Sequence, residues 1–295
     1  MNTKSILPAI SRRSLVVLIA GFLLLAGVVP AKAQDAAYKG AAETVYLADI
    51  VARANPEGVM LFTGGYRKWS GPLDKEYGIH SSHKQLGFII GMNPAYAQGS
   101  LYGEWKPVLY FQARLQYDGY RFFGANGALL SFPSADAKFG RDETTALKGQ
   151  EETGWGQRVM VQPVITAKAG PVIIRNTTDL AYYRFDGKGP YFYEWEYDTL
   201  LKDGDYLIDN TTAFLMEAWK GPDAEMLLAG PFYQITNAAS ADITRQRIGV
   251  QAFWSPAGPI GSFSHPRVYG KLGVNLQDRN RDNELFLIVG MGFDF

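Results

Sequence analysis

The histidines are the residues best suited to acid–base chemistry in this chain, because the sequence contains three of them and no cysteine. Two stand together in His80-Ser81-Ser82-His83, and the third is His265. A histidine can act as general base for a serine hydroxyl when both are held rigidly and a third group orients the ring. This pair lies in a polar stretch between Gly78 and Lys84, so a solvated loop is the simpler interpretation.

The same histidines could also bind a surface metal, because imidazole suits zinc, copper or nickel. Two ligands three residues apart make only half a site, and no neighbouring residue completes it. Segment 278–282 (DRNRD) alternates oxygen ligands like a calcium loop, but it lacks the glycine at the sixth position and carries two arginines. We therefore predict no metal and no cofactor, and an exposed hairpin loop at 278–282.

Charged residues also recur at alternate positions of otherwise apolar segments, which on a strand puts all charges on one face. If such strands enclose a lumen, these charges could select permeants by sign, or they could pair and plug it. Both alternatives stay open, and any cation preference is expected at the acidic segment 193–198. The basic candidates are Lys106, Arg114, Arg158, Lys168, Arg175, Arg247 and Lys271, and the acidic candidates are Asp118, Asp179, Glu194, Glu196 and Asp198.

The clearest element that could position such residues is the last one. From Leu285 to Phe295 every second residue is apolar, and the residues between them are mostly small or polar. One face of this predicted strand is therefore wholly apolar. A strand of this kind ending on an aromatic residue resembles the closing strand of Gram-negative outer-membrane β-barrels. That resemblance implies that the barrel-assembly machinery reads Met291, Phe293 and Phe295 as an assembly signal.

The resemblance to outer-membrane proteins also suggests a possible catalytic role for the histidine pair. In the outer-membrane phospholipase, a histidine and a serine two residues apart work with a downstream asparagine, and His80, Ser82 and Asn93 would be the nearest equivalents here. The rest of that family's motif is missing. A lipid-acting enzyme is therefore the least favoured function, and we assign no catalytic residues.

Strand patterns punctuated by Gly, Pro, Asn and Asp continue from Gly58 to the last residue. At roughly 3.3 Å per residue and a tilt near 40°, segment 105–117 would rise about 30 Å, close to the height of a bilayer's apolar band with its aromatic girdles. The predicted fold is all-β: a closed, antiparallel, up-and-down transmembrane barrel. Its twelve expected strands are 58–68, 85–96, 105–118, 119–133, 159–168, 171–185, 193–199, 205–218, 223–236, 242–255, 268–277 and 285–295.

The expected turns are Asp118-Gly119, Gly170-Pro171, 186–190 and Asp203-Gly204. One difficulty follows from this strand count. If both termini are periplasmic, the long polar segment 134–153 falls on the periplasmic side, where such barrels usually have short turns. The count could be wrong by one in the first third of the chain, so ten or fourteen strands remain possible.

The N-terminal part predicts export. Residues 1–33 combine a basic start, the apolar run 15–29 and Ala31-Lys32-Ala33, which fits a signal peptide cleaved after Ala33 better than a retained anchor. In segment 34–57, Leu47, Ile50, Val51 and Ala54 recur at helical spacing before Asn55-Pro56. We therefore predict a short helical segment at 34–57, periplasmic or luminal, followed by the barrel at 58–295.

Composition limits the remaining function classes. Removing residues 1–33 lowers the basic residues from 29 to 25 against 29 acidic ones, a net charge of −4, so we expect no nucleic-acid partner. A secreted soluble β-sandwich or lipocalin-like barrel is the main alternative fold, but its core would have to contain the charged face of each strand. The expected partners are outer-membrane lipid, the assembly machinery and an envelope protein.

Two functions therefore lead. The first is a narrow passive channel for small polar solutes in the cell outer membrane, supported by the charged faces. The second is a closed barrel with a structural, assembly or export role beside another envelope protein, which predicts an occluded lumen.

Overall fold

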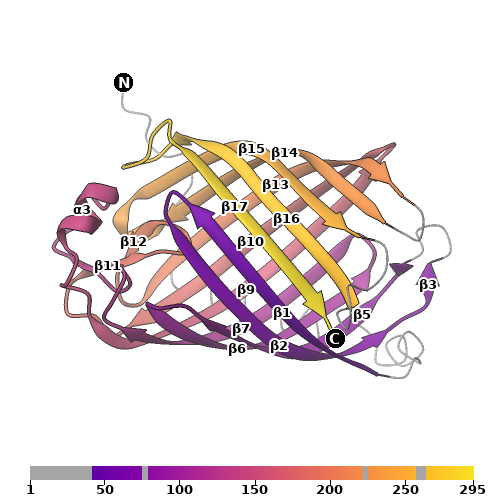
Figure 1. Cartoon of the computed structure of the whole chain (residues 1–295), viewed down its shortest axis with the longest axis horizontal. Helices are drawn as coiled ribbons and strands as arrows, with labels where there is room; N and C mark the ends of the chain where they lie inside the picture. The colour runs from indigo at the N-terminus through magenta and orange to yellow at the C-terminus, as the bar shows by residue number, and fades with distance from the viewer. Residues whose placement is uncertain (1–41, 75–78, 222–224, 257–263) are drawn as a thin grey trace.

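The computed structural model describes residues 42–74, 79–221, 225–256 and 264–295. Twelve of the strands in these ranges form one closed antiparallel barrel, in the order β1-β17-β16-β15-β14-β13-β10-β9-β7-β6-β5-β2 (Figure 1). The barrel strands are β1 (Glu43–Ala54), β2 (Gly58–Ser70), β5 (His83–Met92), β6 (Tyr96–Val108), β7 (Phe111–Phe123), β9 (Thr153–Ala169), β10 (Val172–Phe185), β13 (Asp205–Lys220), β14 (Met226–Ala238), β15 (Ile243–Ser255), β16 (Ser264–Gln277) and β17 (Leu285–Asp294).

The outer surface of the barrel is apolar and its interior is polar, as the alternation predicts. Along β17, Leu285, Leu287, Val289 and Met291 are exposed, whereas the intervening Phe286 is buried. Large apolar side chains are exposed in the same way on the other walls, and buried arginines, aspartates and glutamines lie inside. This inversion confirms the class of outer-membrane β-barrels, because only lipid makes an apolar exterior favourable. The soluble lipocalin-like alternative is wrong.

The helix expected within segment 34–57 is wrong, because residues 43–54 form barrel strand β1. Leu47 and Val51 face the lumen, whereas Ile50 lies on the lipid side. The apparent helical spacing thus combines residues from two faces of a strand. Pairing with β2 on one side and β17 on the other satisfies the backbone of β1, which overrides the weak local pattern. The barrel therefore begins at Glu43 rather than at residue 58.

The expected strands differ from the structure in two further places, although their total is right. Segment 105–118 spans two strands, because β6 ends at Val108 and β7 begins at Phe111, with a two-residue turn between them. The turn expected at Asp118-Gly119 lies inside β7, where Gly119 pairs with Gly99. Segment 193–199 is not a barrel strand at all. Because the prediction omitted one barrel strand, β1, and included one segment that is not a barrel strand, 193–199, the predicted number of strands was still twelve.

With β1 in place, the long connections fall at one end of the barrel. The terminal end holds Phe295 and the tight turns 109–110 and 170–171. The opposite end, here called the far end, holds the two long connections 124–152 and 186–204 (Figure 1). The predicted placement of segment 134–153 on the same side as the termini was a consequence of overlooking β1. In the structure this segment lies at the end opposite the termini of the barrel.

The two long connections fold into a cap at the far end. The cap contains helix α3 (Arg141–Ala146) and a three-stranded sheet of β8 (Ser131–Phe132), β11 (Tyr191–Glu194) and β12 (Thr199–Leu201). Leu129, Phe192 and Leu200 belong to one buried cluster with Tyr120, Tyr183 and other wall residues. The mouth therefore contains a hydrophobic core of its own, which fixes the cap to the barrel. Within the described ranges, no helix is long and apolar enough to span a bilayer.

The barrel closes at the seam between β1 and β17. Phe295 exchanges two backbone hydrogen bonds with Tyr46, and their rings stack with centroids 6.1 Å apart. Inside the seam, the Arg267 guanidinium lies 2.6 Å from Asp294 on β17 and 2.9 Å from Asp49 on β1. One arginine thus holds the first and last strands together from the lumen side.

Candidate functional site

Three cavities follow one another inside the barrel. The outer cavity, at the far end, has a volume of about 710 Å³. The middle cavity, of about 330 Å³, lies below the cap, and the inner cavity, of about 500 Å³, lies nearer the terminal end. Phe62, Ile89 and Arg114 line both the middle and the inner cavity. These two cavities are therefore adjacent along the lumen.

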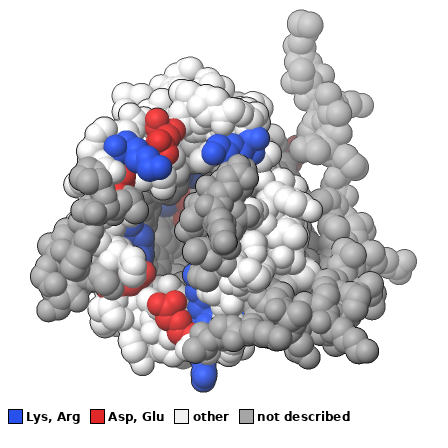
Figure 2. Space-filling model, turned by 90° about the vertical axis from the view of Figure 1, so that its right-hand side faces the viewer, with Lys and Arg blue, Asp and Glu red and all other residues white. Residues whose placement is uncertain are grey.

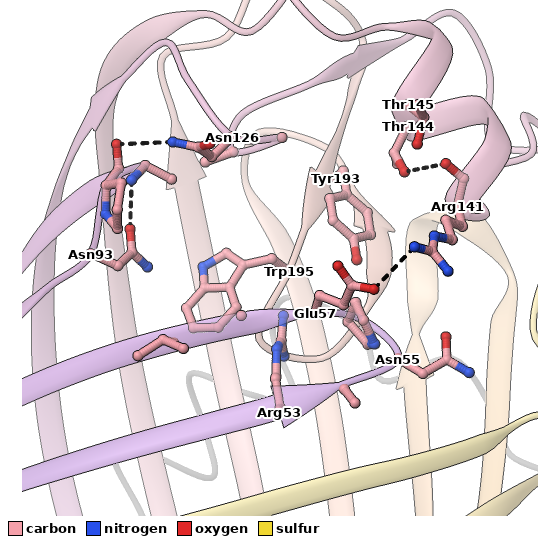
Figure 3. A pocket seen from close by; sticks show the side chains of 18 of the residues that line it. Arg53, Asn55, Glu57, Asn93, Asn126, Arg141, Thr144, Thr145, Tyr193 and Trp195 are labelled. Atoms are coloured by element: carbon pink, nitrogen blue, oxygen red, sulfur yellow. Dashed lines mark hydrogen bonds and ion pairs between the residues drawn. The ribbon is translucent and has the colours of Figure 1, made fainter.

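Arg53 and Trp195 line both the outer and the middle cavity. The Arg53 guanidinium carbon lies 4.2 Å from the centroid of the Trp195 ring, and Nη1 donates to the carbonyl oxygen of Glu196 at 3.1 Å. The close-up in Figure 3 shows Arg53, from β1, pointing toward the Trp195 side chain of the cap. This cation–π pair therefore lies at the boundary between the outer and the middle cavity, where Gly58 and Val59 of β2 also line both.

The terminal end of the lumen is a wide polar vestibule. Figure 2 looks into this end and shows basic and acidic side chains around a hollow. Glu104 accepts hydrogen bonds from Arg114 at 2.7 and 3.1 Å and lies 2.8 Å from Nε2 of His83. Opposite signs are thus interspersed on the wall, and the vestibule has no uniform charge.

In the middle of the lumen, charges pair between the wall and the cap. Arg158 on β9 donates to Asp118 at 2.6 Å and to Glu196 of the cap at 2.5 Å. Asp179 on β10 accepts from the Tyr197 hydroxyl at 2.7 Å and from Gln162 at 2.7 Å. These bonds anchor the underside of the cap to β9 and β10.

Asp198 is the centre of a second set of contacts between the cap and the wall. Its carboxylate lies 2.7 Å from Nε of Arg281, 3.7 Å from Arg245 and 3.9 Å from Arg247, and it accepts from the Tyr193 hydroxyl at 2.6 Å. Burial alone would raise the pKa of Asp198, but Arg245 and Arg281 outweigh it and hold the pKa below its usual value. Asp198 is therefore an anion that joins the 186–204 connection to β15 and to the β16–β17 loop.

The pKa of Glu194 is shifted in the opposite direction to that of Asp198. Burial, followed by repulsion from Glu196, raises the pKa of Glu194 to about 7. Its carboxylate accepts from the backbone N–H of Tyr197 at 2.7 Å, which closes the 194–197 turn. The cap thus contains one carboxyl group that changes charge near neutral pH.

The lumen candidates fall into two groups. Nine lie on inward-facing positions of barrel strands, and Arg114, Arg158 and Asp179 among them line a cavity. Glu194, Glu196 and Asp198 lie on the cap instead. A cation preference there is not supported, because Arg158 pairs with Glu196 and three arginines surround Asp198. The nine wall positions are Lys106, Arg114, Asp118, Arg158, Lys168, Arg175, Asp179, Arg247 and Lys271.

The phospholipase-like set does not assemble. His80 belongs to β4 (Ile79–His80) and Ser82 precedes β5, both at the terminal end, whereas Asn93 follows β5 at the far end. Ten residues of β5 separate them, which corresponds to roughly 30 Å at 3.3 Å per residue. Among the described residues, no group of three or more His, Asp or Glu is placed to hold a metal. Loop 278–282 is a hairpin loop as expected, but its Arg281 is buried against the cap.

Four important residues were not among the candidates: Arg53, Trp195, Arg245 and Arg281. Arg53 was assigned to the supposed helix, and Trp195 to the lipid face of a strand that does not exist. Arg245 alternates with Arg247 along β15 and could have been found by the same parity. No local signal identifies Arg281, whose partner Asp198 is 83 residues away.

Comparison with known proteins gives architecture only. No protein-family model and no curated protein matches the chain. An outer-membrane channel from Pseudomonas putida F1 is similar in structure, with 10% identity, a TM-score of 0.43, and coverage of 88% of this chain and 98% of that chain. The β domain of the Bordetella autotransporter BrkA has 10% identity, a TM-score of 0.38, and coverage of 86% and 99%. LpxR from Salmonella typhimurium has 10% identity, a TM-score of 0.36, and coverage of 85% and 99%.

Proposed function

We propose that this protein is a narrow outer-membrane channel for small polar solutes. The observation that carries the proposal is that Arg53 and Trp195 line both the outer and the middle cavity. A solute crossing this point has to displace one stacked side-chain pair rather than unfold the cap. A cation–π contact contributes about 0.5–2 kcal/mol, so thermal motion can open it. We propose that this pair forms a constriction between a wall strand and the folded cap, so the expected permeants are small.

The proposed orientation places the cap and the outer cavity on the cell surface. Barrels of this class carry short turns on the periplasmic side and long loops outside. The chain has no cysteine, so a single introduced cysteine reports its own position. Lys188→Cys, at an exposed position of the 186–204 connection, is expected to react with an impermeant thiol reagent on whole cells. Tyr110→Cys, in the exposed β6–β7 turn, is expected to react only after lysis. The reverse pattern would refute this orientation.

Conductance in planar bilayers tests the channel itself. Wild-type protein is expected to give small, brief openings, and Trp195→Ala larger and longer ones, because the constriction loses its ring. Trp155→Ala is the matched control, because Trp155 is 61% exposed on the outer surface and lines none of the three cavities. Absence of conductance in both wild type and Trp195→Ala, with folded barrels verified by heat-dependent migration on gels, would reject the channel.

A closed structural or assembly barrel is the second candidate. The hydrophobic core of the cap and the ion pairs below it favour this alternative, because paired charges across a lumen fill it without conducting. It predicts no current from Trp195→Ala and co-purification with another envelope protein. In either case we expect the barrel-assembly machinery to recognise the strand that carries Met291, Phe293 and Phe295.

A further inference from the structure

The outer cavity has the composition of a binding site rather than a simple opening. It is lined by the β1–β2 and β5–β6 turns, by α3 and by the cap sheet. Tyr193, Trp195, Asn93 and Asn126 lie around it in Figure 3, and Tyr96 lines it too. Its volume of about 710 Å³ lies within the roughly 300–1,000 Å³ typical of small-molecule pockets. Aromatic rings and several hydrogen-bonding groups thus line one space.

Two polar groups on this cavity have no partner in the described part of the chain. Tyr96 is 1% exposed, yet its hydroxyl makes no hydrogen bond, and the buried Nε of Arg53 makes none either. Leaving a buried polar group unpaired costs about 1–3 kcal/mol, so such groups usually mark a missing partner. Both residues line the outer cavity, so a shift of either side chain would bring its buried polar atom to a molecule bound there.

The side-chain N–H donors of two asparagines on the cavity are only weakly engaged. Asn126 donates to the carbonyl oxygen of Pro94 at 3.4 Å, beyond the usual range for an N–H···O bond. Asn93 donates to the sulfur of Met60 at 3.3 Å, and a thioether is a weak acceptor. The amide oxygen of Asn93 is fixed by the backbone N–H groups of Ala95 and Tyr96 at 2.8 and 2.9 Å. It is therefore the Asn126 amide that can turn to a better acceptor at little cost.

Two of the three arginines that line the cavity are already paired with carboxylates. Arg141 pairs with Glu57 at 3.1 Å on the rim, and Arg281 is held by Asp198 at 2.7 Å. A strongly charged ligand would have to break these pairs, whereas a neutral ligand leaves them intact. The third arginine, Arg53, is engaged by the Trp195 ring and by the carbonyl oxygen of Glu196. The site therefore favours a ligand that offers hydrogen-bonding groups over one that must break ion pairs.

We propose that the outer cavity binds a neutral saccharide. A sugar ring has an apolar C–H face that suits an aromatic ring, and its hydroxyl groups both donate and accept, which matches the tyrosine hydroxyl and the amides. The proposal goes beyond the channel, because binding requires no conduction. A saccharide at this position would also contact Trp195 at the constriction.

Calorimetric titration of the refolded full barrel tests this, in a detergent without a sugar headgroup. The probes are the neutral trisaccharides maltotriose, cellotriose and isomaltotriose, with inorganic phosphate and uridine for comparison. At least one trisaccharide is expected to bind. Tyr96→Phe removes only the unpartnered hydroxyl and is expected to weaken binding roughly three- to tenfold, as for one lost hydrogen bond. Trp195→Ala is expected to weaken it about tenfold or more.

Tyr120→Phe is the matched control, because Tyr120 is also buried with an unpartnered hydroxyl but does not line the outer cavity. Asn126→Gly tests the rim without altering the barrel core and keeps the positive φ of 55° at this position accessible. Equal affinities of Tyr96→Phe, Asn126→Gly and wild type would overturn the proposal. Binding of phosphate or uridine but of no trisaccharide would overturn it too. Sugar binding without conductance would reject only the channel, and conductance without sugar binding would reject only this site.

Discussion

Replacing Asp198 by asparagine should release the cap from the barrel. Asparagine keeps the size of the side chain and also tolerates the positive φ of 51° found here, so the change removes mainly the charge. At an effective dielectric constant near 20, the 2.7 Å contact with Arg281 amounts to about 6 kcal/mol of gross attraction. Repulsion among the arginines and the desolvation of each ion offset part of this. Removing one partner of a buried ion pair typically costs about 3–5 kcal/mol, and we expect that range.

Hydrogen exchange of the amides in 191–201 measures this directly, because these residues belong to the cap sheet. A cap destabilised by about 3–5 kcal/mol should exchange at least about 100-fold faster, since about 1.4 kcal/mol corresponds to tenfold. Asp203→Asn is the control from the same connection. Its pair with Arg184 is exposed on both sides, 53% and 60%, so this substitution should change the stability of the cap by less than about 1 kcal/mol. Equal exchange in the two variants would refute the role assigned to Asp198.

Three further predictions concern the cap and the seam. The pKa of Glu194 is raised from 4.5 to about 7, so between these pH values the folded cap binds more protons than the unfolded chain. The stability of the cap should therefore fall by roughly 2–3 kcal/mol as the pH rises from 4.5 to 7 and then level off. Limited proteolysis of the cap at pH 5 and pH 8 measures this pH dependence, and Glu194→Gln should remove it. A variant that is as pH-sensitive as wild type would show that Glu194 is not the group responsible. Arg267→Met removes the cation shared by the two seam carboxylates. Given the partial exposure of the arginine, it should cost about 1 kcal/mol and lower the unfolding midpoint on gels by a few degrees; an unchanged midpoint would contradict the seam contact. Phe295→Ala should reduce the amount of folded barrel in the outer membrane more than its stability after refolding in vitro, and equal losses in both assays would indicate a structural role only.

The lipid-facing surface could be predicted from the sequence because a strand has only two faces. The parity of Leu287 and Val289, and that of Arg158 and Lys271, is correct in the structure. The position of turns is less certain, because alternation continues through a tight hairpin. Across the β6–β7 turn the parity of Trp105 and Ala113 is the same, so the pattern alone could not show that the chain reverses between them.

The cap could not be predicted in this way, because its contacts join distant parts of the sequence. The run Tyr193-Glu194-Trp195-Glu196-Tyr197 alternates as well as a barrel strand does. Its tyrosines are buried in a core and Trp195 contacts Arg53, so none of the three aromatic rings faces lipid. What distinguishes this run is that wall residues on other strands supply its partners, and a period of two contains no information about them.

The position of the cap explains where its polar contacts with the wall are made. Its two connections leave the barrel between β7 and β9 and between β10 and β13, and β10 is six places from β1 around the twelve-stranded ring, directly across from it. The ion pairs of Arg158 and the bonds of Asp179 therefore fill the β9–β10 side of the lumen. The β1–β2–β5 side has only short turns at the far end, and all three cavities are lined by residues from these strands or the turns between them. The cavities thus follow the β1–β2–β5 side, where the stacked pair of Arg53 and Trp195 borders both the outer and the middle cavity.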